Sequence, residues 1–322
     1  MTEKPSLNRE IIVRGARVLA TLAPFADELA VYPAHPVRPD AHDYALAFCI
    51  PMDTPGLKFL CRDSCSGTLN VHDHPLSSRF DEQDAFAIFD DVEVPWDRIH
   101  INCNVLVYNQ VMSTGWFPNV MQQTMIRAQT KLEFAWGVAT RMTEAVGGLQ
   151  PPSVQMLGEL WRYGEFARSC IRMAEENAYE FGNGVWFPHG APMTALKSML
   201  PTWFPRVNEI IRLLGSHNLL AAPTQSQLAN PELRPLIDRY MHGANGIDAE
   251  TRARLFRLAW DFTGSALGSR GEQYERFYLA SGARNQQVAH MIADRSRADR
   301  LVDRFLKEET VLAPELKLAE AV

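Results

Sequence analysis

The sequence predicts an α+β protein in which a small β-domain is followed by an antiparallel helical bundle. Short runs rich in β-branched and aromatic residues fill the first third of the chain. Beyond about residue 104, apolar residues recur every three or four positions, which is the period of a helix. We therefore expect a β-barrel domain over residues 1–104, a helical bundle over residues 105–310 and a tail over residues 311–322.

Six short runs predict the strands of the β-domain. They are Ile11–Val13, Ala16–Leu22, Glu28–Tyr32, Tyr44–Ile50, Leu57–Cys61 and Ala85–Val92. Residues that favour turns, among them Pro33, Asp40 and the segment Pro51–Gly56, separate these runs. Short strands at this spacing are typical of a small barrel or sandwich.

Long segments with an apolar stripe predict the bundle. The first stripe runs from Met125 to Val146, and Gly147–Gly148 ends its helix. A second helix is expected to continue to the turn Gly182–Gly184, and three more are expected over residues 192–220, 249–267 and 285–306. Large aromatic residues at helical spacing are core residues first, and this applies to Trp116, Trp136, Trp161 and Trp260. Long helices with short connections predict antiparallel packing.

Composition and charge exclude several classes of partner. The chain has 32 Lys and Arg residues against 38 Asp and Glu residues, so it lacks the basic surplus of a nucleic-acid-binding protein. No apolar run approaches the ~20 residues that span a bilayer, so we expect no membrane segment. The five cysteines are odd in number and widely scattered, which predicts reduced thiols and a cytoplasmic protein.

Several longer motifs carry a family resemblance. They are Ala20–Pro24, Ala47–Asp53 (AFCIPMD), Pro75–Glu82 (PLSSRFDE), Phe89–Trp96 (FDDVEVPW), His242–Asp248 (HGANGID) and Gly264–Tyr278 (GSALGSRGEQYERFY). With these motifs the chain resembles the oxygenase components of the 4-hydroxyphenylacetate 3-monooxygenase family. The resemblance implies an acyl-CoA dehydrogenase-like fold, in which a β-barrel precedes a helical bundle.

The resemblance also implies an activity and its partners. Such an oxygenase takes reduced FAD from a separate flavin reductase. It hydroxylates a phenol such as 4-hydroxyphenylacetate, ortho to the hydroxyl group, through a flavin C4a-hydroperoxide. Homotetramers are expected, with the flavin site shared between subunits. Motifs of the family's N-terminal helical domain, which binds and activates the phenol, have no counterpart here. Three explanations stay open: the chain is a truncated piece, it is one half of a split gene whose other half is a separate chain with that domain, or the protein has lost hydroxylation. We expect this chain alone to hydroxylate poorly, and no catalytic residue is assigned.

The resemblance marks three places for the flavin. Thr21 resembles a threonine that contacts the flavin ring near N5, although a strand-forming threonine needs no such role. Arg270 follows two glycines and is expected either to pair with a pyrophosphate or to form an ion pair with Glu272 or Glu275. The turn Ala280, Ser281 and Gly282 resembles a segment that touches the FAD diphosphate, and its alternative role is to end a helix.

A second resemblance concerns the phenol. Pro33, Ala34 and His35 lie where the family has a mobile loop that closes over the substrate. The alternative is an ordinary surface connection between strands. His35 is a candidate acid or base, although a single histidine in a loop is more often simply solvated.

Two other interpretations are considered. Cys61 and Cys65, with nearby histidines, fit no standard zinc spacing, so no metal is predicted. A 4-hydroxybutyryl-CoA dehydratase, a sister branch with an iron–sulfur cluster, needs a His and a Cys on the first bundle helix, and residues 118–131 contain neither. A non-catalytic protein that binds flavin or holds an oligomer together is the remaining alternative.

Overall fold

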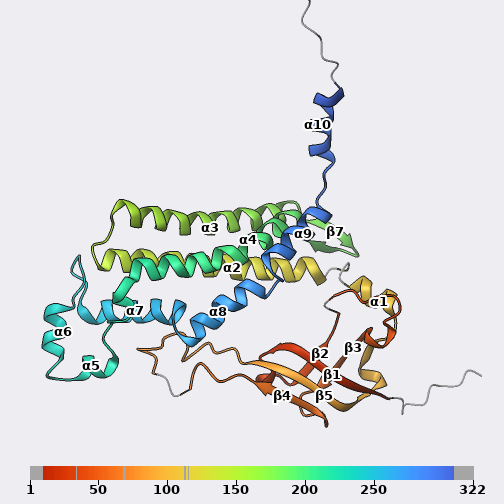
Figure 1. Ribbon diagram of the computed structural model, residues 1–322, viewed down its shortest axis with the longest axis horizontal. Coiled ribbons are helices and arrows are strands. Elements are labelled where there is room, and N and C mark those ends of the chain that lie inside the picture. The colour runs from red at the N-terminus through yellow and green to blue at the C-terminus, as the bar shows by residue number, and fades with distance from the viewer. Residues whose placement is uncertain (1–9, 34, 68–69, 112–113, 115, 308–322) are drawn as a thin grey trace, which may run out of the picture.

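A computed structural model describes residues 10–33, 35–67, 70–111, 114 and 116–307. Figure 1 shows a layer of long helices lying over a smaller β-domain, which sits toward one end of the layer. The chain passes from the β-domain to the helices after Asn102, where the last of its six strands ends. Asn104 then caps the first helix, because its side chain accepts a hydrogen bond from the Val107 N–H.

Two three-stranded sheets make up the β-domain. Their strands are β1 (Glu10–Thr21), β2 (Glu28–Val31), β3 (Leu46–Pro51), β4 (Leu57–Cys61), β5 (Asp84–Pro95) and β6 (Ile99–Asn102). The first sheet has the order β1-β5-β4 and the second the order β2-β3-β6, with antiparallel pairing throughout. The expected strands are present, and the two runs before residue 23 are joined into the single strand β1, which is bulged after Val13 and Val18.

The inner faces of the two sheets share one apolar core. Phe48 and Ile50 of β3 pack with Ala87, Phe89 and neighbouring residues of β5. The rings of Phe48 and Phe89 meet edge to face with centroids 5.9 Å apart. Since each fully buried side chain of this size contributes about 1.5–3 kcal/mol, this contact holds the two sheets together.

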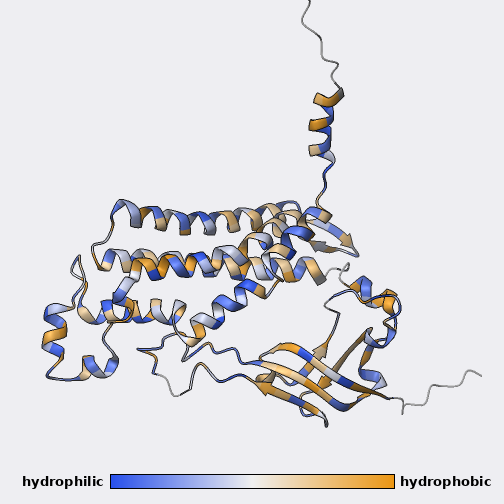
Figure 2. Ribbon diagram, in the orientation of Figure 1, coloured by the Kyte–Doolittle hydropathy of each residue, from blue (hydrophilic) through white to orange (hydrophobic). Residues whose placement is uncertain are grey.

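Ten helices are described. They are α1 (Val105–Gln110), α2 (Trp116–Ala145), α3 (Pro151–Glu176), α4 (Gly190–Gly215), α5 (Gln225–Ala229), α6 (Arg234–Tyr240), α7 (Ala249–Thr263), α8 (Ala266–Phe277), α9 (Gly282–Ile292) and α10 (Ser296–Lys307). The long helices α2, α3 and α4 lie side by side, and α7 packs against α2 and α4 (Figure 1). In Figure 2, α10 extends away from the body with alternating apolar and polar turns.

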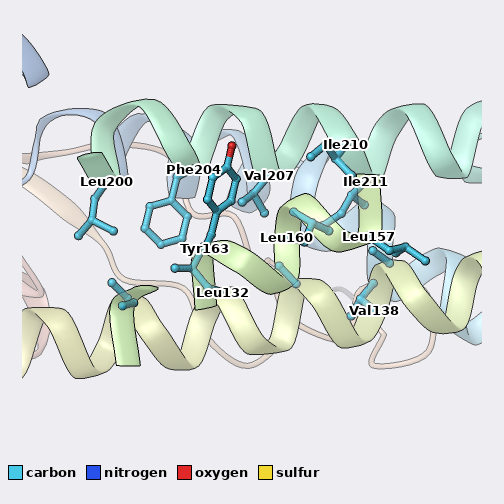
Figure 3. Close-up of a cluster of buried hydrophobic side chains, with 14 of the residues drawn as sticks. Leu132, Val138, Leu157, Leu160, Tyr163, Leu200, Phe204, Val207, Ile210 and Ile211 are labelled. Atoms are coloured by element: carbon cyan, nitrogen blue, oxygen red, sulfur yellow. The ribbon is translucent and has the colours of Figure 1, made fainter. Parts of the chain in front are cut away.

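The bundle core lies between the long helices (Figure 3). Leu132 of α2, Leu160 of α3 and Phe204 and Ile211 of α4 are almost fully buried there. Tyr163 also points into this core; its ring stacks on Trp203 with centroids 4.6 Å apart. A buried hydroxyl needs a partner, and that of Tyr163 donates to Glu159 at 2.6 Å.

The second bundle helix is shorter than expected. It ends at Glu176 rather than at the turn Gly182–Gly184, and a hairpin follows. In this hairpin β7 (Tyr179–Gly182) pairs with β8 (Val185–Phe187). Gly182, Asn183 and Gly184 all have positive φ, as a tight Asn-Gly turn requires, so the turn closes a hairpin instead of ending a helix.

The fourth expected helix ends earlier than expected and is followed by a separate helix, and the last expected helix is divided in two. α7 ends at Thr263, and Ser265 caps α8 by accepting a hydrogen bond from the Gly268 N–H at 3.1 Å. α9 ends at Ile292, and α10 begins at Ser296. A capping serine in the middle of an apolar stripe starts a new helix, because its side chain satisfies N–H groups that the preceding turn leaves unpaired.

The tryptophans do not all lie in the core. Trp260 packs against it, but Trp161 is 52% exposed and Trp136 is 38% exposed. The expectation was wrong for these two, because the packed stripe of α2 and α3 follows smaller residues such as Ala135 and Leu160. The Trp116 side chain lies outside what the structure describes.

No described helix is sufficiently long and apolar to cross a lipid bilayer.

Candidate functional site

The candidate site begins where β1 ends. Thr21 is the last residue of β1 and lies directly opposite Asp84, the first residue of β5. Its hydroxyl Oγ1 donates to Asp84 Oδ1 at 3.1 Å, and its side chain is otherwise exposed. Leu22 then takes a left-handed conformation (φ 65°), which turns the chain away from the sheet. Thr21 is therefore fixed at the edge of the sheet with one side open.

Two arginines hold the Asp84 carboxylate. Arg270 of α8 donates from Nη2 to Oδ1 at 2.7 Å and from Nε to Oδ2 at 2.8 Å. Arg62 donates from Nε to Oδ2 at 3.0 Å. These contacts, those of Arg270 first, lower the pKa of Asp84 from 3.8 to about 2 although burial opposes the change. Asp84 is therefore an ionised acceptor; we name Thr21, Arg62, Asp84 and Arg270 the junction cluster.

The junction cluster joins the β-domain to the bundle. Arg270 lies 186 positions after Asp84 and also pairs with Glu82 at 2.8 Å. The sequence suggested Glu272 or Glu275 as ionic partners of Arg270, but its described carboxylate partners are both in the β-domain. Nearby, the buried Asp261 of α7 accepts the Leu76 N–H at 2.7 Å, so the segment before β5 is also fixed to the bundle. The flavin role of Arg270 stays a prediction.

An apolar row lies beside the junction cluster on the same face of the sheet. Phe86 is two residues after Asp84 on β5, so both side chains point to one face. Its cross-strand partners are Val18 on β1 and Leu60 on β4. All three are exposed, Val18 by 72% and Leu60 by 64%. A hydroxyl next to an exposed apolar row suits a flat ring with a polar edge.

A stripe of aromatic and cationic side chains continues from the cluster along α8. Arg270, Tyr274 and Tyr278 recur every four residues and so share a helix face. The guanidinium of Arg270 lies 5.0 Å from the Tyr274 ring centre, and Arg127 of α2 lies 5.2 Å from the same ring. Tyr278 stacks on Tyr274 with centroids 4.7 Å apart. The stripe leads toward the turn that begins α9.

This turn combines a left-handed residue with a helix start. Ala280 has φ 73°, and Ser281 caps α9 by accepting the Arg284 N–H at 3.4 Å. Gly282 lies close to α4, since a Cβ added there would meet Pro201 Cβ at 3.6 Å. The three residues predicted to contact a diphosphate are thus together at a helix N-terminus, where backbone N–H groups favour anions.

A lysine missed by sequence reasoning lies near the same turn. Lys197 of α4 is half-buried, and burial, helped by the charge of Arg284, lowers its pKa. Among the residues that the structure describes, no carboxylate pairs with it, and its Nζ lies 5.6 Å from the centre of the Phe117 ring. A small hollow is lined by Lys197, Pro201, Leu279 and, from α2 and α8, Arg127 and Tyr278. A positive charge without a carboxylate partner beside the turn fits an anionic group such as a diphosphate.

A buried carboxylate in the lining of this hollow pairs with two cationic side chains. Glu275 of α8 is only 5% exposed and accepts from Arg127 Nη2 at 3.0 Å and from Lys131 Nζ at 3.1 Å. The hydrogen bonds and charges of these two residues lower the pKa of Glu275 in spite of its burial. Arg127 is therefore held against Tyr274 and Tyr278 by a fixed carboxylate.

The segment predicted to cover a phenol is only partly described. Pro33 is buried and His35 is exposed, while Ala34 lies outside the described residues. Asn109 of α1 fixes the following backbone, because its side chain accepts the Val37 N–H and donates to the Val37 carbonyl, both at 2.9 Å. No contact joins Pro33 or His35 to the junction cluster among the described residues, and their substrate role stays a prediction.

Within the described ranges, His, Cys, Asp and Glu form no group of three or more that is suited to a metal ion. All five cysteines are free thiols.

Comparison with known proteins identifies the family. A family model described as "4-hydroxyphenylacetate 3-hydroxylase C terminal" matches residues 107–307, and one described as "4-hydroxyphenylacetate 3-hydroxylase N terminal" matches residues 8–101. The chain belongs to the 4-hydroxyphenylacetate 3-hydroxylase family. This confirms the resemblance on which the acyl-CoA dehydrogenase-like fold was predicted.

Several curated proteins of the 4-hydroxyphenylacetate 3-hydroxylase family are similar to the chain. It is 36% identical over 309 residues to the "4-hydroxyphenylacetate 3-monooxygenase oxygenase component" of Thermus thermophilus, covering 95% of this chain and 64% of the relative. It is 35% identical over 274 residues to the "4-nitrophenol 2-monooxygenase, oxygenase component" of a Rhodococcus species, covering 83% of this chain and 52% of the relative. The chain thus spans about two thirds or less of the length of these relatives.

Solved structures agree with the family. The oxygenase component of 4-hydroxyphenylacetate 3-monooxygenase complexed with FAD and 4-hydroxyphenylacetate superposes with a TM-score of 0.87 at 36% identity, covering 92% of this chain and 62% of that chain. An archaeal 4-hydroxybutyryl-CoA dehydratase superposes with a TM-score of 0.79 at 17% identity, covering 93% of this chain and 60% of that chain. The second likeness shows a shared fold only.

Proposed function

We propose that this chain forms the flavin-binding part of the oxygenase component of a two-component aromatic monooxygenase that uses reduced FAD. The observation that carries the proposal is the junction cluster beside the exposed row Val18, Phe86 and Leu60, in a chain 36% identical to a relative named as such an oxygenase. A solved relative is complexed with FAD and 4-hydroxyphenylacetate. The described residues fit the flavin ring and the diphosphate of FAD.

The flavin ring and the diphosphate of the cofactor would each meet residues of matching chemistry. The apolar row would support the flavin ring, and Thr21 would meet its polar edge. Lys197 and the N–H groups at the start of α9, beside Ala280, Ser281 and Gly282, would hold the diphosphate. Bound reduced FAD supplies the chemistry, which is activation of oxygen and transfer of one oxygen atom to a phenol. Arg270 acts through Asp84 in this proposal, by fixing the carboxylate that contacts Thr21.

The substrate and partners form part of the proposal. The phenol is 4-hydroxyphenylacetate or a similar para-substituted phenol, hydroxylated ortho to its hydroxyl group, and residues 33–35 form part of the loop that covers it. A separate flavin reductase supplies reduced FAD, as the words "oxygenase component" in the relatives' names imply. A chain that carries the family's N-terminal helical domain is a further partner, and residues 1–104 and 105–310 remain our proposed domains. Five free thiols fit a cytoplasmic location.

Exposed apolar side chains on the bundle support a homotetramer. Trp161, Phe166 and Met173 of α3 are each more than half exposed, and the exposed Trp136 of α2 lines the same shallow hollow as Trp161. Large exposed apolar patches mark interaction surfaces. Because symmetric oligomers pair identical patches, a second copy is the expected cover. Light scattering at micromolar concentration should give four times the mass of the chain, and a monomer would contradict the proposal.

Catechol formation tests the activity. The purified chain would be mixed with a flavin reductase, FAD, NADH and a panel of phenols, with and without the N-terminal part of the Thermus thermophilus relative. We expect little catechol from the chain alone and clear turnover when that part is added. If neither mixture forms catechol while the intact relative does so under the same conditions, the oxygenase proposal fails.

A non-catalytic function is the second candidate. The exposed apolar side chains of α3, which support assembly, fit this candidate as well. Such a protein would hold reduced flavin or an oligomer without hydroxylating a phenol. A sample that binds FAD and assembles, yet forms no catechol in either mixture, would support this candidate.

A further inference from the structure

We propose that α10 of one copy of the chain docks on α2 and α3 of a second copy, and that the second copy returns the same contact. The docking site is the shallow hollow that Trp136 and Trp161 line, which we name the α2–α3 hollow. The inference rests on the part of the proposed function in which copies of this chain assemble, and it is independent of the flavin.

The first observation is that α10 stands alone. In Figure 1 it lies away from the other helices, and none of its residues belongs to an apolar cluster within the described part of the chain. The helix has 12 residues. Isolated helices shorter than about 12–15 residues are marginal in water, because most helical stability in proteins comes from packing of an apolar face. α10 therefore needs a surface to pack against.

The second observation is the apolar side that α10 offers. Ala298, Leu301, Val302 and Phe305 have the spacing that places side chains on one side of a helix. The last three are 57%, 58% and 75% exposed. In Figure 2 the turns of α10 accordingly alternate between apolar and polar colours. An exposed apolar face of this kind marks an interaction surface.

The third observation is the apolar lining of the α2–α3 hollow. Its apolar and small residues are Leu132 and Trp136 of α2 and Leu160, Trp161 and Gly164 of α3. A Cβ added at Gly164 would meet nothing within 4 Å, so there is open space above this glycine. A bulky apolar side chain such as Phe305 would occupy that space and remove the exposed indole rings from water.

The fourth observation is the charge around the hollow and along α10. Arg168 pairs with both Glu133 and Glu165, which leaves one net negative charge among the charged residues that line the hollow. Three arginines lie along one flank of α10, namely Arg297, Arg300 and Arg304. A basic flank beside an apolar face complements an acidic rim beside an apolar lining, and such complementarity fixes the orientation of a contact.

A second copy fits α10 better than the other possible occupants of its apolar side. α10 points away from the bundle of its own chain (Figure 1), whereas the hollow of a second copy is free to receive it. An anionic lipid surface would repel the carboxylates of Asp299 and Asp303 on the same helix. Two-fold symmetry makes the contact reciprocal, because each copy has both α10 and the hollow, so the pair closes on itself.

Disulfide cross-linking between two differently tagged copies of the full chain tests the inference. One copy carries Ala298→Cys on the apolar side of α10, and the other carries Glu165→Cys at the hollow. Asp303→Cys replaces Ala298→Cys in the matched control, since Asp303 lies on the opposite side of α10. The wild type mixed with each variant measures cross-linking through the five native thiols. A chain that carries both Ala298→Cys and Glu165→Cys reports contact within one copy.

The strength of association provides the second readout. Phe305→Asp places a charge on the apolar side of α10, and Gly164→Leu fills the hollow with a residue that favours helices. Each should raise the dissociation constant between copies at least about tenfold, as loss of a central apolar contact does. Asp303→Asn should leave it unchanged. Light scattering over a dilution series measures the constant, and circular dichroism shows that each variant is folded.

The outcomes separate this inference from the proposed function. We expect a disulfide between copies from Ala298→Cys with Glu165→Cys, well above the level of every control. A disulfide that forms only within the double variant, or binding of the chain to anionic lipid vesicles without a disulfide between copies, would overturn the inference. If the copies associate but no such disulfide forms, the inference is wrong and the proposed assembly stands. A wild type that is monomeric and does not cross-link would contradict both.

Discussion

Replacing Asp84 with asparagine tests the junction cluster through stability. The carboxylate is ionised in the folded chain because Arg270, Arg62 and Thr21 donate to it, and its pKa falls from 3.8 to about 2. A difference of this size corresponds to about 2 kcal/mol of folding free energy at pH 7. Asp84→Asn should therefore lower the free energy of unfolding by about 2 kcal/mol, or more if the arginines are left without sufficient partners.

The stabilisation by Asp84 depends on pH in a direction that follows from its lowered pKa. The folded pKa of Asp84 lies below the unfolded value, so the stabilisation is complete well above pH 3.8 and is lost as the pH falls toward 2. The difference between the wild type and Asp84→Asn should shrink to about half its neutral value near pH 3. Urea unfolding followed by circular dichroism at pH 7, 5, 4 and 3 measures this difference, and other carboxylates cancel because both proteins carry them.

Asp90→Asn on the same strand is the control. Asp90 pairs with Lys58 at 2.6 Å, but both side chains are more than half exposed. Exposed ion pairs contribute little to stability because solvent screens them, so Asp90→Asn should have a small effect. Equal losses for the two variants, or a loss for Asp84→Asn that does not change between pH 7 and pH 3, would refute the assignment of Asp84 as a buried, ionised acceptor.

Three further predictions concern stability, each measured by urea unfolding at pH 7. Asp261→Ala should cost about 3 kcal/mol, because the buried carboxylate accepts two backbone N–H groups and the Ser77 hydroxyl, and these donors would lose their partner. Glu275→Gln should also cost about 3 kcal/mol, because it removes the buried charge that pairs with two partly buried cationic groups. Gly56→Ala should cost about 2 kcal/mol, because φ is +85° and the new Cβ would lie 2.4 Å from the Asp90 carbonyl oxygen. By contrast, the new Cβ of Gly158→Ala on α3 would meet nothing within 4 Å, so this variant should be more stable by about 0.5–1 kcal/mol.

Each of these predictions has an outcome that contradicts it. A loss below about 1 kcal/mol for Asp261→Ala would mean that water replaces the carboxylate, so that the segment before β5 is not fixed through it. A neutral Glu275→Gln would mean that the ion pair is not desolvated as its burial indicates. If the two glycine variants behaved alike, the backbone at Gly56 would not have the described conformation.

Local patterns in the sequence predicted much of the fold. The alternation and turn residues before residue 100 gave most of the strands, and Thr21 was placed correctly at a strand end. The stripe from Met125 to Val146 gave a helix that is observed as α2, Trp116–Ala145. These features depend on neighbours within a few residues, so a single sequence contains them.

Features that depend on distant partners were missed. Asp84 and Arg270 are 186 positions apart, and nothing local marks Asp84 as the partner of Arg270 rather than Glu272 or Glu275. Lys197 is unremarkable in its helix, and only the fold brings it near Ala280 and Arg284. The helix boundaries at Ser265 and Ser296 were also not predicted, because an apolar stripe continues through both positions.

The affinity for reduced FAD, compared between the wild type and a Thr21 variant, tests the central claim. The claim is that the flavin ring lies beside Thr21, at the end of β1. The measurement is an anaerobic titration of the wild-type chain and of Thr21→Trp, in which an indole at an exposed position would fill the space beside Phe86 without disturbing a core. We predict saturable binding by the wild type and at least about tenfold weaker binding by Thr21→Trp, with a circular dichroism spectrum that shows the fold is retained. Equal binding by the two proteins would show that the flavin lies elsewhere and would contradict the account.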